Sequence, residues 1–158
     1  MFDAFVKIDG INGESSDQKH AGWIEVLHYN FSVAQEVSQT ASTAGGATAE
    51  RADFSEFTFS KLLDVTSPKM ALACAEGRHI NTIKVDLCRA GRVIYMRYKL
   101  TDCLINKIST IGNGDFPDEE VAINYGRIEL VYTQQSRRGG MAAGVVAVGW
   151  DRTINCKI

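Results

Sequence analysis

The chain has 158 residues, of which 45% are hydrophobic and 23% charged, and its formal net charge is -2. A chain of this length can bury about two-thirds of its unfolded surface in one core, so we expect residues 1–158 to form a single domain. The near-neutral charge argues against nucleic-acid binding and against attachment to a membrane surface. We therefore expect no nucleic-acid partner and no membrane insertion.

Residues 1–10 have the alternating pattern of a short strand. Phe2, Ala4, Val6 and Ile8 form one clearly apolar face, and the charged residues Asp3, Lys7 and Asp9 alternate with them on the other face. Such a segment is not typical of a signal-peptide core, and no run of 18 apolar residues follows it. We expect a protein that is made and folded in the cytoplasm and that, if exported, leaves the cell without a cleaved signal peptide.

Residues 23–37 are predicted to form a long strand with one apolar and one polar face. The polar face carries His28, Asn30 and Ser32. The next segment, 38–50, contains small and polar residues and is predicted to be an exposed loop. Loops longer than about 12 residues in compact domains are usually functional or disordered. This segment is therefore the leading candidate for a contact with a partner.

Residues 51–77 contain the clearest local signals in the sequence, an alternating strand followed by a helix. Apolar residues recur at period two in Phe57, Phe59 and Leu63, as a half-buried strand requires. The period then changes to that of a helix. This segment therefore supplies a strand and the only clear helix of the sequence.

The helix is predicted to have about nine residues. Ser67 can cap its first turn, Pro68 suits its first position, and Gly77 favours the left-handed end. One face is apolar and is predicted to pack against a sheet, with Met70, Ala73 and Cys74 on it.

The second half of the chain is predicted to consist of strands. Residues 83–88 turn into a long strand over 93–108, which makes a hairpin. In 121–132 the apolar phase changes by one residue, which predicts a bulge near Gly126. The last strand is predicted over 145–155. Seven or eight strands with one short helix predict a mainly β fold, either a closed or nearly closed barrel or a sandwich.

Two loops in this half carry opposite charge. Residues 110–120 are acidic, and residues 134–144 are basic and flexible. They could attract each other between subunits. Two solvated loops that never meet explain the charges equally well, because exposed ion pairs contribute only about 0–1 kcal/mol each.

The sequence lacks a recognisable catalytic or metal-binding constellation. His20, His28 and His79 are too far apart in sequence to form a paired metal motif. Cys74 is expected to be a core thiol, and the carboxylates at 118–120 are expected to be solvated. We therefore predict no catalytic residues, no metal and no cofactor, and hence no enzyme.

Several short motifs follow one another in a specific order along nearly the whole chain. They are F-V-K-I at 5–8, G-E-S at 13–15, His20, W-I-E-V-L at 23–27, F-x-F-S-K at 57–61, T-S-P at 66–68, L-A-C-A-E-G-R-H at 72–79, R-A-G at 89–91 and G-W-D at 149–151. In order and spacing they resemble the haemolysin-coregulated protein (Hcp) family, the tube component of type VI secretion systems. Each motif is structural rather than catalytic.

This resemblance implies a small β-barrel of two sheets with one short α-helix on its flank. It also implies a homohexameric ring, and rings that stack into a hollow tube. A contractile sheath would propel the tube, a spike protein would sit at its tip, and small effector proteins would travel in the lumen. The alternatives are a small cupin-like barrel enzyme or ligand-binding domain that uses the histidines, and a phage-type tail-tube protein.

The same resemblance implies two sets of functional residues. The loop after the second strand would reach a neighbouring protomer through Gly45, Gly46, Thr48, Glu50 and Arg51. The polar face of the strand before it would line the lumen through His28, Asn30 and Ser32. A solvated strand on the outside of the ring is the alternative for the second set, because strand alternation does not distinguish inside from outside.

Overall fold

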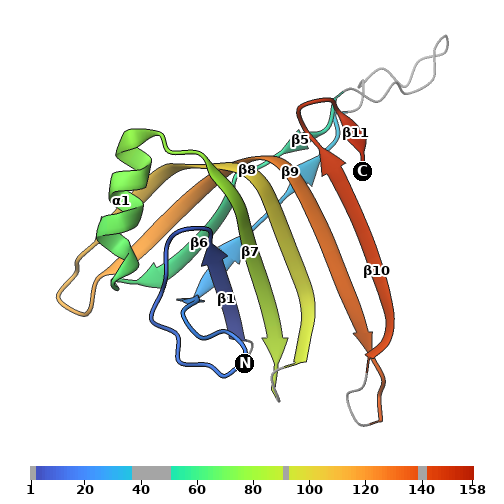
Figure 1. Cartoon of the computed structure of the whole chain (residues 1–158), viewed down its shortest axis with the longest axis horizontal. Helices are drawn as coiled ribbons and strands as arrows, with labels where there is room; N and C mark the ends of the chain where they lie inside the picture. Colours follow the sequence, from blue (N-terminus) through green and yellow to red (C-terminus); the bar gives the residue numbers. More distant parts are fainter. Residues whose placement is uncertain (1–2, 37–50, 91–92, 139–141) are drawn as a thin grey trace.

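The computed structural model describes residues 3–36, 51–90, 93–138 and 142–158. In these residues the chain is mainly β, with one helix, α1, on the flank (Figure 1). The elements are, in chain order, β1 (Asp3–Ile8), β2 (Ile24–Val26), β3 (His28–Asn30), β4 (Val33–Ala34), β5 (Asp53–Phe54), β6 (Phe57–Leu62), α1 (Thr66–Glu76), β7 (Ile80–Arg89), β8 (Val93–Ile111), β9 (Asp118–Gln135), β10 (Ala142–Asp151) and β11 (Cys156–Lys157).

The strand pairing of the larger sheet returns on itself. From β9 it passes through β8, β7 and β1 to β2, and the chain then continues directly into β3, which pairs with β6. β6 in turn pairs with the first half of β9. Between β2 and β3 the N–H of Leu27 donates to the carbonyl oxygen of Ser60 at 2.8 Å, so hydrogen bonding continues at that junction. The predicted small barrel with a flanking helix is confirmed, and β4 and β5 form a separate two-stranded sheet.

The core fills the barrel and consists of apolar side chains at alternate positions of the wall strands. On β1 the predicted apolar face is buried at Val6 and Ile8. Phe5 points to the opposite face but is buried as well, because its ring stacks on His20 with centroids 4.4 Å apart. On β6 Phe57 is fully buried, whereas Leu63, which was predicted to share its face, is exposed and lies beyond the strand.

Helix α1 confirms the predicted apolar face and helix end, but begins earlier than predicted. Met70 and Ala73 are buried, and Gly77 ends the helix in the left-handed conformation with φ of 60°. The N-cap is Val65 rather than Ser67. The Ser67 hydroxyl instead accepts the backbone N–H of Asp64 at 3.0 Å. The helix has 11 residues and is longer than expected, because its N-cap lies two residues before the predicted one.

The long strand predicted over 23–37 is wrong as one element. The segment forms three short strands, β2, β3 and β4, and each pairs with a different strand. The partner changes from β1 to β6 at Leu27, where the barrel wall turns. Local alternation continues across this turn, so the pattern alone did not reveal the interruption.

The structure has no bulge at Gly126, although the alternation of buried side chains in β9 does change there. The buried side chains of β9 change phase just after Tyr125, and those of β8 change at the same level, next to Asp102, whose φ is 55°. Because both strands change together, their register is not shifted at Gly126. The register shift between these strands lies between Ile105 and Lys107.

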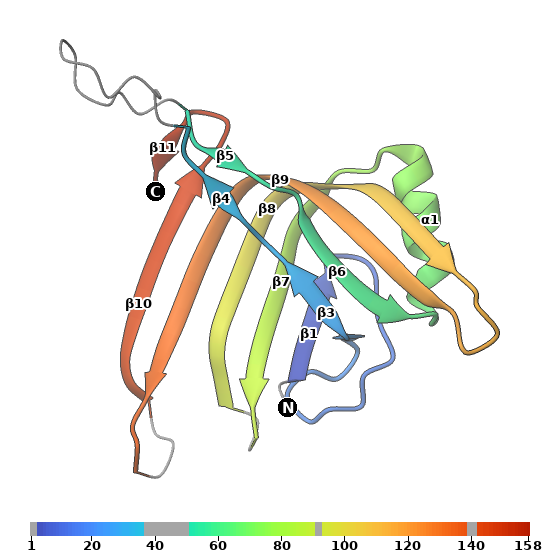
Figure 2. The ribbon, with the colours of Figure 1, turned by 180° about the vertical axis from the view of Figure 1, so that it is seen from behind.

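The acidic and basic segments lie at opposite ends of β9 (Figure 2). Residues 118–120 of the acidic segment belong to β9 itself rather than to a loop. The predicted last strand also differs, because β10 ends at Asp151 and is followed by a turn and the short β11. The two charged segments therefore cannot meet within one protomer, and a contact between protomers remains a prediction.

Candidate assembly surfaces

The apolar inner face of the sheet continues beyond the barrel onto β10. Val148 is the cross-strand partner of Leu130, and Val146 is the cross-strand partner of Tyr132. The side chains of Val146 and Val148 therefore lie on the sheet face that forms the core in the neighbouring strands. Yet Val146 is 65% exposed and Val148 is 60% exposed. We call Tyr132, Val146 and Val148 the uncovered face. A continuous apolar surface of this kind marks a site of contact with another molecule.

The outer edge of β10 is also open. β11 pairs with β10 only at Trp150 and Asp151, so residues 144–148 have no strand partner on that side within the described part of the chain. Val145, on the other face of the strand, is 64% exposed. Proteins usually protect such edges with charged residues or proline. Residues 142–150 contain neither, so β10 has an unprotected edge as well as an uncovered face.

An apolar groove of about 590 Å³ adjoins the uncovered face. β10 contributes Val148 and Trp150 to its lining, and Phe31, Val33 and Ile158 come from the segments beside it. Trp150 stacks on Phe54 with ring centroids 6.1 Å apart, which closes the groove toward the core. The apolar surface near β10 is therefore hollowed rather than flat.

β6 ends across the molecule from β10 (Figures 1 and 2), and several apolar residues near that end are exposed. Leu62 and Ile111 both pair with Asp118, from the two sides of β9. The N–H of Leu63 donates to the carbonyl oxygen of Pro117 at 3.0 Å, which brings the next residues close. We call the exposed apolar residues at this end the far patch; they are Leu62, Leu63, Val65, Ile111 and Phe116.

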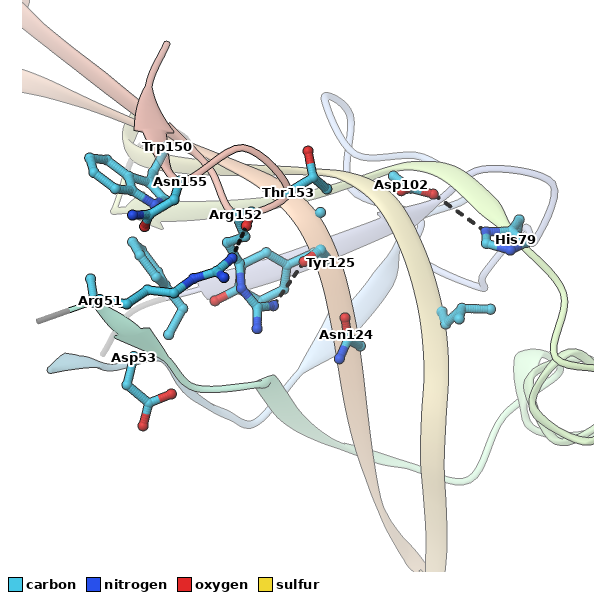
Figure 3. A pocket seen from close by; sticks show the side chains of 14 residues that line it. Arg51, Asp53, His79, Asp102, Asn124, Tyr125, Trp150, Arg152, Thr153 and Asn155 are labelled. Carbon is cyan, nitrogen blue, oxygen red and sulfur yellow. Dashed lines mark hydrogen bonds and ion pairs between the residues drawn. The ribbon is translucent and has the colours of Figure 1, made fainter.

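Of the predicted interface residues, four lie outside the described residues: Gly45, Gly46, Thr48 and Glu50. Arg51 is described, and its Nη2 donates to the carbonyl oxygen of Arg152 at 2.6 Å. It lines a pocket of about 510 Å³, shown in Figure 3. Arg152 lies deeper in this pocket, where its Nη1 donates to the carbonyl oxygen of Tyr125 at 2.8 Å.

The pocket around Arg51 is lined by both polar and apolar residues. Both non-glycine residues with positive φ in the described part of the chain, Asp102 and Asn155, line it. His79 lies at the end away from Arg51, with Nδ1 3.4 Å from Asp102, and both side chains are exposed. Burial raises the pKa of Tyr125 to about 12, and its hydroxyl donates to the carbonyl oxygen of Ser55 at 2.7 Å. The pocket offers hydrogen-bonding groups next to the segment before Arg51.

The predicted lumen residues lie together on an exposed surface. His28 and Asn30 point outward from β3, whereas Tyr29 between them packs against the core. His28 and Asn30 line a hollow of about 520 Å³, which Ser60 shares. Ser32 is exposed beyond β3, and its N–H donates to the Ser55 Oγ at 2.9 Å. The structure thus groups two of the three residues in one hollow.

A buried lysine joins β6, β9 and the start of α1. The Lys61 Nζ lies 2.8 Å from Glu119 Oε2 and 2.9 Å from Asp64 Oδ1, and donates to Ser67 Oγ at 3.1 Å. Lys61 and Glu119 are both buried, so the prediction that Glu119 is solvated is wrong. The sequence indicated only that Lys61 is buried, because Lys61 continues the period of two that begins at Phe57 and Phe59.

A second buried cluster surrounds Asp86 on β7. Its carboxylate accepts hydrogen bonds from Arg97 Nε at 2.6 Å and Nη2 at 2.7 Å, and lies 2.8 Å from His20 Nε2. The other ring nitrogen of His20 is 3.0 Å from Asp17 Oδ1. Both nitrogens of His20 therefore face carboxylates, and this histidine connects residues 17–20 to the sheet.

The buried thiols are expected to be unreactive in the native protein. Burial, with the nearby Asp86 carboxylate, raises the pKa of Cys88 to about 11, and burial raises the pKa of Cys103 to about 12. At pH 8 we expect iodoacetamide to label the exposed Cys156 first and the buried Cys88 much more slowly, because the raised pKa of Cys88 lowers its thiolate fraction and burial limits access to its sulfur. Peptide mass spectrometry over time measures the rates. The urea-unfolded protein is the control, and equal rates in the native state would contradict the assignment.

The titratable groups in the two buried clusters are paired within the fold. Among the described residues no three His, Cys, Asp or Glu side chains are placed to hold a metal ion. The one helix found there is too short to cross a membrane. The fold and its surfaces define a small, mainly β protein with exposed apolar surfaces suited to contacts with other molecules.

Comparison with known proteins gives the family. The family model described as "Type VI secretion system effector, Hcp" matches residues 5–132. The chain is 31% identical over 154 residues to Protein hcp1 of Pseudomonas aeruginosa, covering 94% of each chain. The chain belongs to the Hcp family of type VI secretion systems, which confirms the resemblance found in the sequence.

Solved structures share the whole fold. A type six secretion system protein matches with a TM-score of 0.92 and 28% identity, covering 100% of both chains. Hcp1 from Salmonella typhimurium matches with a TM-score of 0.83 and 29% identity over 99% of each chain. A type VI secretion system effector from Yersinia pestis matches with a TM-score of 0.78 and 30% identity, covering 94% of this chain and 99% of that one. β10, which lies beyond the family match, therefore belongs to the shared fold.

Proposed function

We propose that this protein is the structural tube subunit of a type VI secretion system. Its protomers form hexameric rings, and the rings stack into an exported tube that carries small effector proteins. The observation that carries the proposal is the open, uncharged edge of β10 together with the uncovered face. Such an edge is a template for pairing with another chain, and the apolar face beside it gains free energy when it is covered.

The far patch supports a ring rather than a two-fold dimer. It lies across the molecule from the uncovered face and consists of different residues. When one surface of a protomer contacts a different surface of the next, the contact is head-to-tail, and it closes into a ring if the rotation allows. Six protomers is the number that the family resemblance implies.

The segment before Arg51 is proposed to contact a neighbouring protomer through Gly45, Gly46, Thr48, Glu50 and Arg51. The pocket next to Arg51 supports this role, because it offers hydrogen-bonding groups at one end of the segment. The lumen is proposed to be lined by His28, Asn30 and Ser32. Their exposure supports this, since a lumen wall must present polar side chains to water and to cargo.

The proposed partners follow from the tube function. They are other copies of the chain, small effector proteins in the lumen, a spike protein at the tube tip and a contractile sheath around it. The protein is proposed to be cytoplasmic before the tube is fired and to be secreted then without a cleaved signal peptide. It is not proposed to be an enzyme.

Replacement of Val146 by Lys tests ring assembly. We expect the wild-type protein to have six times the protomer mass in light scattering and to form rings of six in negative-stain images. Val146→Lys should have the protomer mass, because a lysine in a buried apolar contact must lose its hydration without gaining a partner. Leu72→Lys is the matched control, since Leu72 is an exposed apolar residue on α1, and this variant should form rings.

Two results would contradict the proposal. One is a wild-type protein that stays a single protomer at all concentrations. The other is a Val146→Lys variant that forms the same rings as the wild type. Circular dichroism of each variant establishes that it is folded. Deletion of residues 42–49 tests the proposed contact of the segment before Arg51 separately. This deletion is expected to weaken ring assembly.

A further inference from the structure

Three lysines lie in one row across the outer face of the barrel. Lys7 on β1 pairs with Lys84 on β7, and Lys84 pairs with Lys99 on β8. Their side chains line a hollow of about 230 Å³, together with Asp9 and Thr82. We call Lys7, Lys84 and Lys99 the lysine row. Like charges at directly opposed positions destabilise an antiparallel pair, so the row is unfavourable in the isolated protomer.

Little within the protomer compensates these charges. The Lys99 Nζ lies 3.8 Å from Glu129 Oε2, a long contact between side chains that are both partly exposed. In the described part of the chain neither Lys7 nor Lys84 forms an ion pair. Of the three cations, only Lys99 therefore has a carboxylate within 4 Å in the described part of the chain, and Asp9 lines the hollow without an ion pair to any of them.

The neighbouring charges on the same sheet face are balanced. Two residues away along the strands, Arg97 pairs with Asp86, its direct cross-strand partner. Two residues away in the other direction, Arg127 on β9 pairs with Asp151 on β10 at 2.7 Å. The excess positive charge is thus confined to one row of a face whose other opposed charges are matched.

We propose that the lysine row binds a short acidic segment of another protein, whose carboxylates lie between the three ammonium groups. This goes beyond the proposed tube function, because neither the uncovered face nor the far patch includes these lysines. Ammonium to carboxylate hydrogen bonds are charge-assisted and are strengthened where water is partly excluded. The hollow supplies such a place, because Lys84 is already partly buried in it.

A nucleic acid fits the row less well than a protein carboxylate does. Asp9 and Glu129 lie at the two ends of the row and would repel a long polyanion that runs past it. The chain as a whole has a net charge of -2, so no extended positive field attracts phosphate backbones. A few carboxylates placed over the centre of the row avoid both penalties.

Binding of a fluorescein-labelled hexaglutamate peptide tests the proposal by fluorescence anisotropy at low ionic strength. We expect Lys84→Gln to weaken binding about fivefold relative to wild type. Lys107→Gln removes the same charge from an exposed position on β8 outside the row, and should bind as wild type does. Addition of 0.5 M NaCl should abolish the difference, because the contacts are partly exposed to screening. Light scattering establishes that all three proteins have the same assembly state.

Thermal unfolding without the peptide gives an independent measurement. Lys84→Gln should raise Tm by about 1–3 °C at low salt, because it removes the repulsion at the centre of the row. Lys107→Gln should leave Tm unchanged. The proposal is overturned if both variants bind the peptide equally, if a single-stranded oligonucleotide of the same charge binds the row as tightly as the peptide, or if Lys84→Gln lowers Tm.

Discussion

Lys61→Met is expected to destabilise the fold by about 3–5 kcal/mol, because it leaves a carboxylate buried without its counter-charge. The Glu119 side chain is 1% exposed and lies 2.8 Å from the Lys61 Nζ. Without the lysine this carboxylate must stay unpaired or take up a proton, and both cost free energy. Guanidinium unfolding measures the loss as a lower midpoint at an unchanged slope. All variants are compared at one protein concentration, since assembly also shifts apparent stability.

The double variant Lys61→Met/Glu119→Leu separates the charge effect from the loss of packing. Replacing both partners of a buried ion pair by apolar residues is often nearly neutral. We therefore expect the double variant to be within about 1–2 kcal/mol of wild type, and more stable than Lys61→Met alone. A double variant whose cost equals the sum of the two single costs would contradict the pairing, and so would a Lys61→Met variant with wild-type stability.

Asp86→Ala is expected to cost about 3–5 kcal/mol. Asp86 is fully buried, and its removal takes away two hydrogen bonds from Arg97 and the contact with His20 Nε2. Arg97 is partly exposed and can be hydrated, but His20 is buried and cannot. Chemical unfolding measures the loss.

Glu76→Ala is the matched control for Asp86→Ala. Glu76 also accepts a hydrogen bond from an arginine, Arg78 Nη2, at 2.8 Å, but both side chains are about half exposed. Exposed pairs of this kind contribute about 0–1 kcal/mol. Equal losses in the two variants would contradict the expected effect of burying Asp86. Asp86→Asn, which keeps the shape but not the charge, should lie between wild type and Asp86→Ala.

The parts of the fold set by neighbouring residues could be predicted from the sequence. The period of two in Val6 and Ile8 defines a buried strand face wherever that strand pairs. Gly77 ends the helix because the left-handed conformation that it adopts there is available to glycine at low cost. The hairpin of β7 and β8 followed from two alternating runs joined by a tight turn. These signals depend on sequence neighbours alone.

Features that depend on distant strands could not be predicted in this way. The break at Leu27 arises because the segment changes partner from β1 to β6, which alternation does not record. Asp86 and His20 are separated by 66 residues, and only the fold brings them together. The pairing of Glu119 with Lys61 required the same knowledge, since three consecutive carboxylates resemble a solvated segment unless an opposite charge is known to face them.

The candidate sites were predicted in part. The exposure of His28 and Asn30 agrees with a polar strand face, while their position in a lumen stays a prediction. The interface residues at 45–50 lie outside the described residues, and their role stays a prediction too. The uncovered face was missed because Val146 and Val148 have the same pattern as any core strand. Whether an apolar face is covered is a property of the folded chain, not of its periodicity.

The paired change of phase in β8 and β9 has a mechanical consequence. Because both strands change at the same level, the pairing of β8 with β9 keeps one register across that level, from Met96 and Tyr132 to Ile105 and Ile123. A load applied to β10 therefore passes first into β9, through their shared hydrogen bonds, and from β9 into β8 and the barrel wall. We therefore expect β10 and the barrel to move together, without a hinge between them.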